Sequence, residues 1–520
     1  MTMQARARFS KYYLFKNAGI TATMGGLGAA TGLVLDAMIL STFGAGYQTD
    51  ALFTALIVPV LLTGIFSIQC PKILVPVFSE YFSRNEDMDA WGLLTNLLTT
   101  CTVVLGGICL VGIMLSGIIV YLEIPGLGAE TVVLGTGLSR ILFITLLAQG
   151  LASILQSALY ARHSYVISSS GKMVGNVVTI LVVAITHNQL GIRSVASGML
   201  LGNLIQVALL AVVLFKYGFR YQGFSVRPDS RLAEILKSFG YPLSGHILGE
   251  SATILQSVLG SFLGAGSVTI IRYGARVTQA IAGILLGSVV QVTLPLIAKH
   301  AAMNDLKAQR KALLESIQLL GVIGLPVCIW LALTAKPLIT LFFERGQFSS
   351  ANSLMTALVI QLMIPDIILG RLVSVTQTIF YSNRDLRTPL ISTVIYTVVN
   401  LVLAILLTHS LGLLGIPIAV SLASLSNASY MISRLQKRFG PMGWSEIRSF
   451  ALRLGATCMI GGIGLLIGKL LPMATMSYSL VRLIDVAVPT GFGVCAFIVG
   501  GFLFGLIDTR ALLVTAKPAS

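Results

Sequence analysis

The sequence contains few charged residues. Asp, Glu, Lys and Arg together make up 10% of the 520 residues, whereas hydrophobic residues make up 55%. An ordinary soluble domain has about 25% charged residues. Uninterrupted apolar stretches long enough to cross about 30 Å of hydrocarbon recur from one end of the chain to the other. This composition excludes a soluble globular protein and predicts a membrane protein.

The residue patterns of enzymes and metal proteins are also missing. The six cysteines lie in or at the ends of apolar runs, and none belongs to a C-x-x-C pair, while the five histidines are scattered. Isolated cysteines of this kind are usually small buried hydrophobes. The sequence has no Ser-His-Asp set, no GxxxxGK phosphate loop and no zinc-ligand spacing. We therefore predict neither an enzyme nor an ATP-driven pump, and we expect no cofactor; a coupling ion is left open.

The long apolar runs predict helices. Backbone polar groups inside a bilayer must be paired within their own segment, and a β-barrel would need short alternating segments instead. We predict an all-α polytopic membrane protein with fourteen spans. The expected spans lie near residues 17–43, 49–69, 92–121, 131–160, 165–186, 192–216, 234–262, 268–298, 309–334, 352–381, 388–408, 411–433, 450–471 and 480–506.

The two halves of the chain carry the same short segments, about 220 residues apart. Residues 43–49, 75–79 and 186–191 are echoed by residues 263–269, 294–298 and 407–412. We therefore predict two six-span lobes related by an internal repeat, followed by two additional spans. The expected domains are residues 1–218, 219–440 and 441–520. Duplicated membrane halves are typical of transporters that rock around a site between them.

A net charge of +16 raises the question of a nucleic-acid partner. The basic residues, however, gather in alternate connections between the spans. The opposite connections, such as residues 44–49 and 123–130, contain no Lys or Arg. This is the positive-inside bias, which predicts that both termini are cytoplasmic. It favours contact with anionic membrane lipids over binding of nucleic acid.

Charged residues within the spans are the candidates for a functional site, because burying them in lipid is costly. Arg272 and Arg276 are four residues apart and share a helical face, and Glu250 on the preceding span is expected to face them. Such a cluster suits an anionic headgroup bound by charge-assisted hydrogen bonds; an ion pair that only holds the bundle together is the alternative. Asp36 and Asp50 are further candidates, and with Glu250 they are expected to hold any coupling ion. Other charges within spans are Arg140, Lys172, Asp366 and Arg371.

An ordered set of motifs resembles the MurJ (MviN) family of the multidrug/oligosaccharidyl-lipid/polysaccharide exporter superfamily. The set comprises Phe-Gly-Ala-Gly-x-x-Thr-Asp-Ala at 43–51, Val-Pro-Val-Phe-Ser-Glu-Tyr at 75–81, Phe-Glu-Arg-Gly-Gln-Phe at 343–348, and Phe-Tyr-Ser-x-x-Asp-x-Arg-Thr-Pro at 380–389. The likeness extends from about residue 17 to about residue 440. It implies a flippase in the bacterial inner membrane that works by alternating access. The implied substrate is an undecaprenyl-pyrophosphate-linked saccharide, with lipid II, the peptidoglycan precursor, as the lead. Arg276 matches a cavity arginine of the family, and we expect the protein to act as a monomer.

Several cavity cations of the family are replaced here by uncharged residues: Ala29, Leu35, Thr63 and Gly64. The sequence therefore leaves three alternatives open. The first is a flippase for an exopolysaccharide or O-antigen repeat unit. The second is a cation-coupled drug exporter of the same superfamily, against which Arg272 and Arg276 argue. The third is a membrane scaffold that transports nothing.

Overall fold

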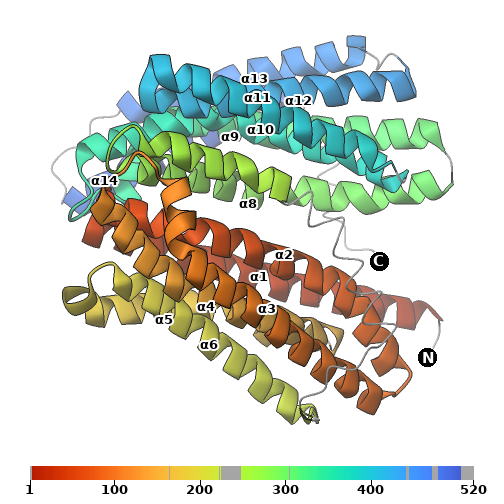
Figure 1. The fold of residues 1–520 in the computed structure, drawn as a ribbon. Helices are drawn as coiled ribbons and strands as arrows, with labels where there is room; N and C mark the ends of the chain where they lie inside the picture. The colour runs from red at the N-terminus through yellow and green to blue at the C-terminus, as the bar shows by residue number, and fades with distance from the viewer. Residues whose placement is uncertain are drawn as a thin grey trace. The chain divides into compact units, whose positions relative to one another are not determined.

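The computed structural model describes residues 3–162, 164–221, 223, 247–303, 305–383, 385–440, 444–470 and 478–504, and these residues form an all-α protein. The first six helices are α1 (Met3–Phe43), α2 (Tyr47–Ser83), α3 (Asp87–Glu123), α4 (Ala129–Ala161), α5 (Tyr165–Leu190) and α6 (Arg193–Lys216) (Figure 1). A helical stretch over residues 247–261 follows. The remaining helices are α8 (Ser267–Ala302), α9 (Leu306–Phe342), α10 (Ser350–Ser382), α11 (Arg387–Leu411), a 3₁₀ turn (Gly412–Leu414), α12 (Gly415–Phe439), α13 (Trp444–Leu470) and α14 (Tyr478–Leu503).

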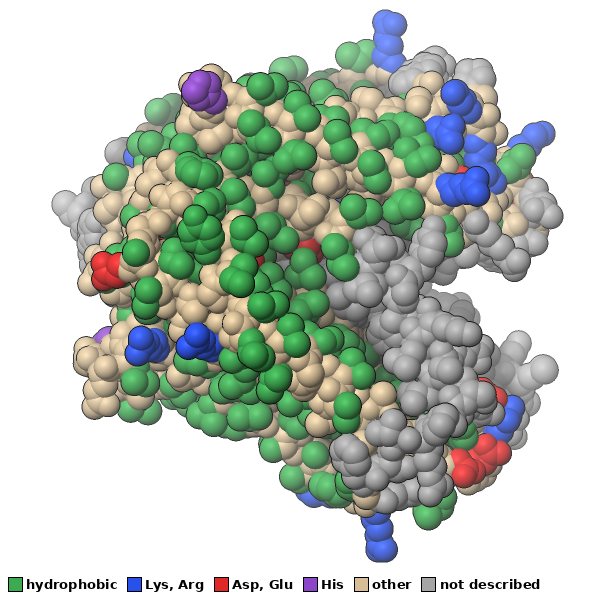
Figure 2. Space-filling view, in the orientation of Figure 1, with side chains coloured by type: hydrophobic (Ala, Val, Ile, Leu, Met, Phe, Trp, Pro, Cys, Tyr) green, Lys and Arg blue, Asp and Glu red, His purple; other side chains and the backbone are tan. Residues whose placement is uncertain are grey.

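Each of the fourteen predicted spans overlaps a helix of the structure, so the predicted fold class is confirmed. Among the described residues, 11 helical segments are long and apolar enough to cross a membrane, and one of these covers both α11 and α12. Most of the helices are longer than the predicted spans, although α6 and α14 are not. At 1.5 Å per residue, the 37 residues of α3 or α9 reach about 55 Å, beyond about 30 Å of hydrocarbon. Apolar side chains are spread widely over the face drawn in Figure 2, and charged side chains are sparse there.

The chain forms two compact units, Met1–Thr269 and Ile270–Ser520. In the first unit α4 packs against α2, α3 and α6, and α5 packs against α1 and α6. In the second unit α10 packs against α9 and α12, and α11 packs against α12, while α13 and α14 pack on each other and on α9. The predicted division at residue 219 concerns the duplicated sequence and stays a prediction.

The internal repeat is visible in the helix pairing. The pairs α3·α4, α4·α6 and α5·α6 recur as α9·α10, α10·α12 and α11·α12. The turns after α5 and α11 also match. Gly191 and Gly412 end these helices with φ of 55° and 58°, and their amides donate to the carbonyls of His187 and Thr408. Glycine adopts this left-handed conformation without the penalty that a Cβ brings, which explains why Leu-Gly recurs at both sites.

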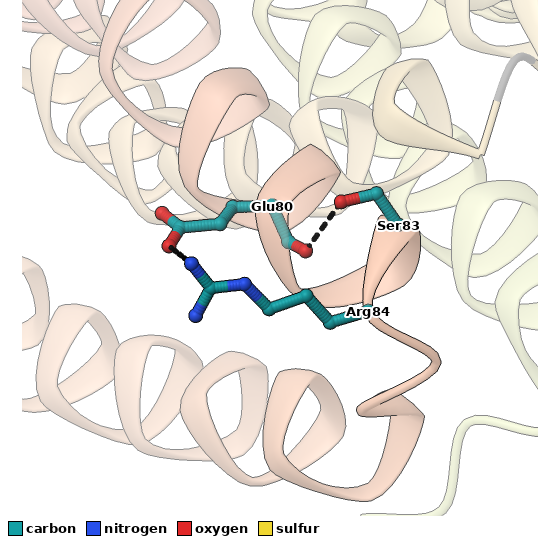
Figure 3. A network of polar contacts seen from close by, with 3 residues as sticks. All are labelled: Glu80, Ser83 and Arg84. Carbon is teal, nitrogen blue, oxygen red and sulfur yellow. Dashed lines mark hydrogen bonds and ion pairs between the residues drawn. The ribbon is translucent and has the colours of Figure 1, made fainter.

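The 75–81 motif lies near the end of α2. Its Phe78 is fully buried in the core of the first unit. Near the end of α2, Glu80 forms an ion pair of 2.8 Å with Arg84, and the Ser83 hydroxyl donates to the Glu80 carbonyl at 2.8 Å (Figure 3). Both partners of the ion pair are more than half exposed, so it contributes little to stability.

The 380–389 motif caps α11 through Asp385. One carboxylate oxygen of Asp385 accepts the amides of Arg387 and Thr388 at 3.0 and 3.1 Å, and the other accepts the Thr388 hydroxyl at 2.7 Å. Burial opposes ionisation of this carboxyl. The hydrogen bonds from Thr388 and Arg387, together with the positive charge of Arg434, outweigh burial and hold the Asp385 pKa below its ordinary value.

Replacing Asp385 by Ala is expected to destabilise the second unit by about 1 kcal/mol, because the first turn of α11 loses its acceptors. The Asp385 pKa is lower in the folded state. The stability that ionised Asp385 contributes to the folded state is therefore complete above its unfolded-state pKa. It is lost as the pH falls through the folded-state pKa. The difference in stability is measured by thermal unfolding of the purified protein in detergent. Wild type and Asp385→Ala are compared at neutral and at acidic pH. Equal unfolding temperatures at neutral pH would contradict the capping role.

Candidate functional site

Arg272 and Arg276 lie on one face of α8, as the sequence predicts. Arg276 is exposed and Arg272 is half-buried. Gly274 packs so closely on α10 that an added Cβ would lie 2.4 Å from a methyl carbon of Val359. Two residues along a helix turn it by about 200°. The contact at Gly274 therefore directs Arg276 to the opposite side of α8, away from α10.

The predicted acidic site residues Asp36, Asp50 and Glu250 all lie in the first unit. Asp36 on α1 is 2% exposed. Glu250 is half-buried within residues 247–261. The arginines belong to the second unit, so the expectation that Glu250 faces them stays a prediction, as do the substrate and ion roles of Asp36 and Glu250.

Asp50 has partners that no local sequence pattern indicates. Its carboxylate is fully buried and accepts three hydrogen bonds from the start of α8. The Gly266 amide donates to Oδ2 at 2.6 Å, and the Thr269 amide and hydroxyl donate to Oδ1 at 2.8 and 2.5 Å. A carboxylate at a helix N-terminus is stabilised by the unpaired amides and the helix dipole. We call this arrangement, with Asp50, Gly266 and Thr269, the clasp.

The backbone at Gly266 is shaped for this contact. Its φ is 90°, a left-handed value that strains any residue with a Cβ. An added Cβ would also lie 2.8 Å from the carbonyl oxygen of Ala45. The loop between α1 and α2 therefore lies directly against the residue that precedes α8. Any side chain at residue 266 would separate the two segments and weaken the clasp.

Apolar packing surrounds the clasp within the first unit. Val268 is fully buried in a cluster with Val120 and Ile124 at the end of α3. Nearby, the Gly126 amide donates to the Ser261 hydroxyl at 3.1 Å. The clasp is therefore shielded from solvent, which strengthens its hydrogen bonds and makes an unpaired partner costly.

The clasp breaks the symmetry of the internal repeat. In α2, the Thr49 hydroxyl accepts the Gly46 amide at 3.0 Å, so that helix is capped by its own residue. The equivalent residue in α8 is Thr269, whose hydroxyl donates to Asp50 instead. The repeat places Ile270 opposite Asp50. Only the first copy of the motif supplies a carboxylate, and it caps the second copy's helix.

Residues of α1 and α5 pack against each other in the first unit. A Cβ added at Gly28 would lie 3.5 Å from the Cβ of Lys172 on α5, and one added at Gly32 would lie 3.4 Å from the side-chain nitrogen of Asn176. The Asn176 amide group donates to the Gly28 carbonyl at 3.0 Å and to the Thr31 hydroxyl at 3.3 Å. The hydrogen bonds from Asn176 join α1 and α5 within the first unit.

In the second unit, Asp366 on α10 accepts a hydrogen bond from the Ser424 hydroxyl of α12. This contact joins two helices within the membrane. Asp366 is one of the charged residues that the sequence predicts within the spans, and it is partly buried.

A family model described as "Lipid II flippase MurJ" matches residues 39–484, which is most of the chain. The chain belongs to the MurJ family. Two curated relatives, both named "Probable lipid II flippase MurJ", come from Buchnera aphidicola. The protein from the Acyrthosiphon pisum subspecies is 26% identical over 78% of this chain and 81% of its own length. The protein from the Baizongia pistaciae subspecies is 25% identical over 91% and 93%.

Solved structures agree on the fold. The structure called "Lipid II flippase MurJ, inward closed conformation" superposes with a TM-score of 0.77 at 20% identity, over 96% of this chain and all of that one. An inward-facing multidrug resistance MATE transporter of the MOP superfamily reaches 0.66 at 16% identity, over 80% of this chain and 94% of its own. These results confirm the predicted family and a multi-pass membrane transporter.

The structure describes two of the positions at which the resemblance led us to expect a cation. Leu35 is 2% exposed and packs in an apolar cluster with Ile39 and Leu52. Thr63 is 5% exposed, and its hydroxyl donates to the Val60 carbonyl of its own helix at 3.0 Å. Both positions are therefore neutral and packed within the first unit.

Proposed function

We propose that this chain moves lipid II, an undecaprenyl-pyrophosphate-linked saccharide, across the bacterial inner membrane. The observation that supports this most directly is the family match over residues 39–484. The exposed Arg276, directed away from α10 by Gly274, provides a cation where an anionic substrate needs one.

The transport step needs a polar path for the headgroup. A pyrophosphate with attached sugars cannot cross hydrocarbon unaided, while a polyprenyl tail remains in lipid. Arg276 binds the pyrophosphate, with Arg272 as a second cation, and alternating access exposes the site to each side in turn. A membrane potential of 100 mV supplies about 2.3 kcal/mol per charge moved. The protein acts as a monomer, because each chain contains both halves of the repeat.

The clasp serves as a releasable attachment in this cycle. Asp50 holds the first turn of α8, the helix that carries Arg276. When the clasp is closed, the start of α8 is fixed to the start of α2. A movement that separates these helix ends must first break all three hydrogen bonds.

Both termini lie in the cytoplasm in this proposal, because basic residues gather in the alternate connections. The turn between α2 and α3 is then cytoplasmic and the turn between α5 and α6 is periplasmic. Met88 and Leu190 are exposed reporters on these two turns, and both are uncharged.

A single cysteine at residue 190 is expected to react with an impermeant thiol reagent added to intact cells. A single cysteine at residue 88 should react only after the membrane is opened. Both are introduced in a background without the six native cysteines. Labelling of a cysteine at residue 88 in intact cells would contradict the proposed orientation.

The proposed function is tested by complementation. Cells depleted of their own lipid II flippase are expected to grow when this chain is expressed, and lipid II should become accessible to a periplasmic lipid II-cleaving enzyme. Parallel binding measurements use lipid II and an unrelated undecaprenyl-pyrophosphate oligosaccharide. Preference for the second lipid would instead favour a polysaccharide flippase. Transport of organic cations without binding of either lipid would contradict the proposal.

A further inference from the structure

A polar cavity of about 630 Å³ lies in the second unit among α9, α10, α13 and α14. Its charged and polar lining comes from Lys336 and Thr340 on α9, Gln361 on α10, Lys469 on α13 and Asp485 on α14. These residues lie near the end of α9 and of α13 and in the first part of α10 and of α14. The orientation proposed above places these helix ends at the periplasmic face, so the cavity is within reach of solutes in the periplasm.

Three charged side chains line this cavity without neutralising one another. Among the residues that the structure describes, no ion pair within 4.0 Å joins Asp485 to Lys336 or Lys469. Both lysines are exposed, whereas Asp485 is half-buried in an apolar helix. A carboxylate in such a helix is costly unless a cation or a hydrogen-bond donor is supplied to it. The three charges therefore suit a ligand that carries charges of both signs.

The rest of the lining is uncharged. The Gln361 side-chain nitrogen donates to the Ala332 carbonyl at 2.7 Å, which joins α10 to α9 beside the cavity. The Thr340 hydroxyl donates at 3.1 Å to Glu344, which is not a lining residue. Four apolar side chains complete the walls: Leu333, Pro337, Leu354 and Leu358. Apolar walls with a few placed polar groups, around a volume of about 300–1,000 Å³, are typical of sites for small organic molecules.

We propose that this cavity binds a short acidic peptide that carries two carboxylates and one ammonium group. Lys336 and Lys469 each bind one carboxylate, and Asp485 binds the ammonium, through charge-assisted hydrogen bonds. Such a ligand has a net charge of −1, which balances the +1 of two lysines and one aspartate. The volume of about 630 Å³ suits a peptide of a few residues rather than a single ion.

Two sources can supply this chemistry. One is a free peptide in the periplasm, and the other is the peptide part of the lipid-linked precursor. The first needs only the cavity, whereas the second rests on the proposed function. Both sources bring carboxylates and an ammonium group to the same three side chains.

Binding of the tripeptide Ala-Glu-Ala to the purified full-length protein, measured by titration calorimetry, tests the proposal. This tripeptide has two carboxylates and one ammonium. Ala-Gln-Ala lacks one carboxylate and acetyl-Ala-Glu-Ala lacks the ammonium. Each is expected to bind about tenfold more weakly, because one charge-assisted hydrogen bond is lost. Equal binding of the three peptides, or no binding of Ala-Glu-Ala, would overturn the proposal and leave the lysines as side chains that only extend to the membrane surface.

Variants assign each charge of the peptide to its partner. Lys336→Gln and Lys469→Gln should each weaken binding of Ala-Glu-Ala about tenfold. Asp485→Asn should weaken binding of Ala-Glu-Ala but not of acetyl-Ala-Glu-Ala, which has no ammonium. Lys307→Gln, at an exposed position at the opposite end of α9, is the matched control and should change neither affinity. Unchanged affinity in the lysine variants, or equal weakening of both peptides by Asp485→Asn, would overturn the proposed contacts.

Lipid II binding to the same variants, followed by native mass spectrometry, distinguishes the two sources. Weaker lipid II binding when both lysines are replaced by Gln would show that the peptide of lipid II occupies the cavity. Loss of Ala-Glu-Ala binding alone would assign the cavity to a free peptide. Because binding is measured without transport, peptide binding can fail while complementation succeeds, and the reverse, so the two failures are distinguishable.

Discussion

Arg276→Ala is expected to abolish complementation in cells depleted of their own lipid II flippase. Arg276 is an exposed cation on α8, at a position where the sequence predicts a cavity arginine. A hydrogen bond to a charged group contributes about 1.5–3 kcal/mol, so lipid II binding by the purified variant should weaken roughly ten- to hundredfold. Arg276→Lys should be intermediate, because an ammonium keeps the charge but loses the planar fork that matches a phosphate.

The matched control is Gln279→Ala, one turn further along α8 at an exposed position. It should support growth at wild-type protein levels. Arg272→Ala is expected to have a smaller effect than Arg276→Ala, since Arg272 is half-buried. Full growth of the Arg276→Ala strain at normal expression would remove the pyrophosphate role from this residue.

The fold could be predicted from the sequence because its signals are local. Apolar length predicts the spans, and recurring Leu-Gly predicts equivalent turns, which the structure confirms at Gly191 and Gly412. Helix ends were harder to predict. Polar continuations such as Glu80–Arg84 at the end of α2 extend a helix beyond hydrocarbon, where hydropathy gives no signal.

The candidate site could be predicted only in part. The spacing of Arg272 and Arg276 predicts a shared face, and α8 confirms it. The contacts of Asp50 could not be predicted, because its partners Gly266 and Thr269 lie more than 200 residues away and donate through backbone amides. One signal was available: the first copy of the repeated motif continues with Asp50 and the second with Ile270. A residue that differs between the two copies of an internal repeat is a candidate for a contact that only one copy makes.

Asp50→Ala is expected to open the clasp. The reporter is Val268→Cys in a background without the native cysteines, because Val268 is fully buried beside Val120 and Ile124. In an otherwise wild-type clasp this cysteine should react very slowly with an impermeant thiol reagent. Without the Asp50 carboxylate, the Gly266 and Thr269 amides lose their acceptor. If the closed clasp loses about 1.5–3 kcal/mol of stabilisation, the labelling rate should rise roughly ten- to hundredfold.

Graded variants connect the labelling rate to the hydrogen bonds themselves. Thr269→Val removes only the 2.5 Å hydroxyl contact and leaves both amides bonded, so it should raise labelling less than Asp50→Ala does. Gln48→Ala alters a partly exposed side chain on the same turn of α2 and should leave the rate unchanged. If Asp50→Ala lowered thermal stability while residue 268 stayed unreactive, the carboxylate would only support the local fold. A raised labelling rate in a stably folded variant that fails to complement would instead show that the attachment of α8 to α2 is a step of transport.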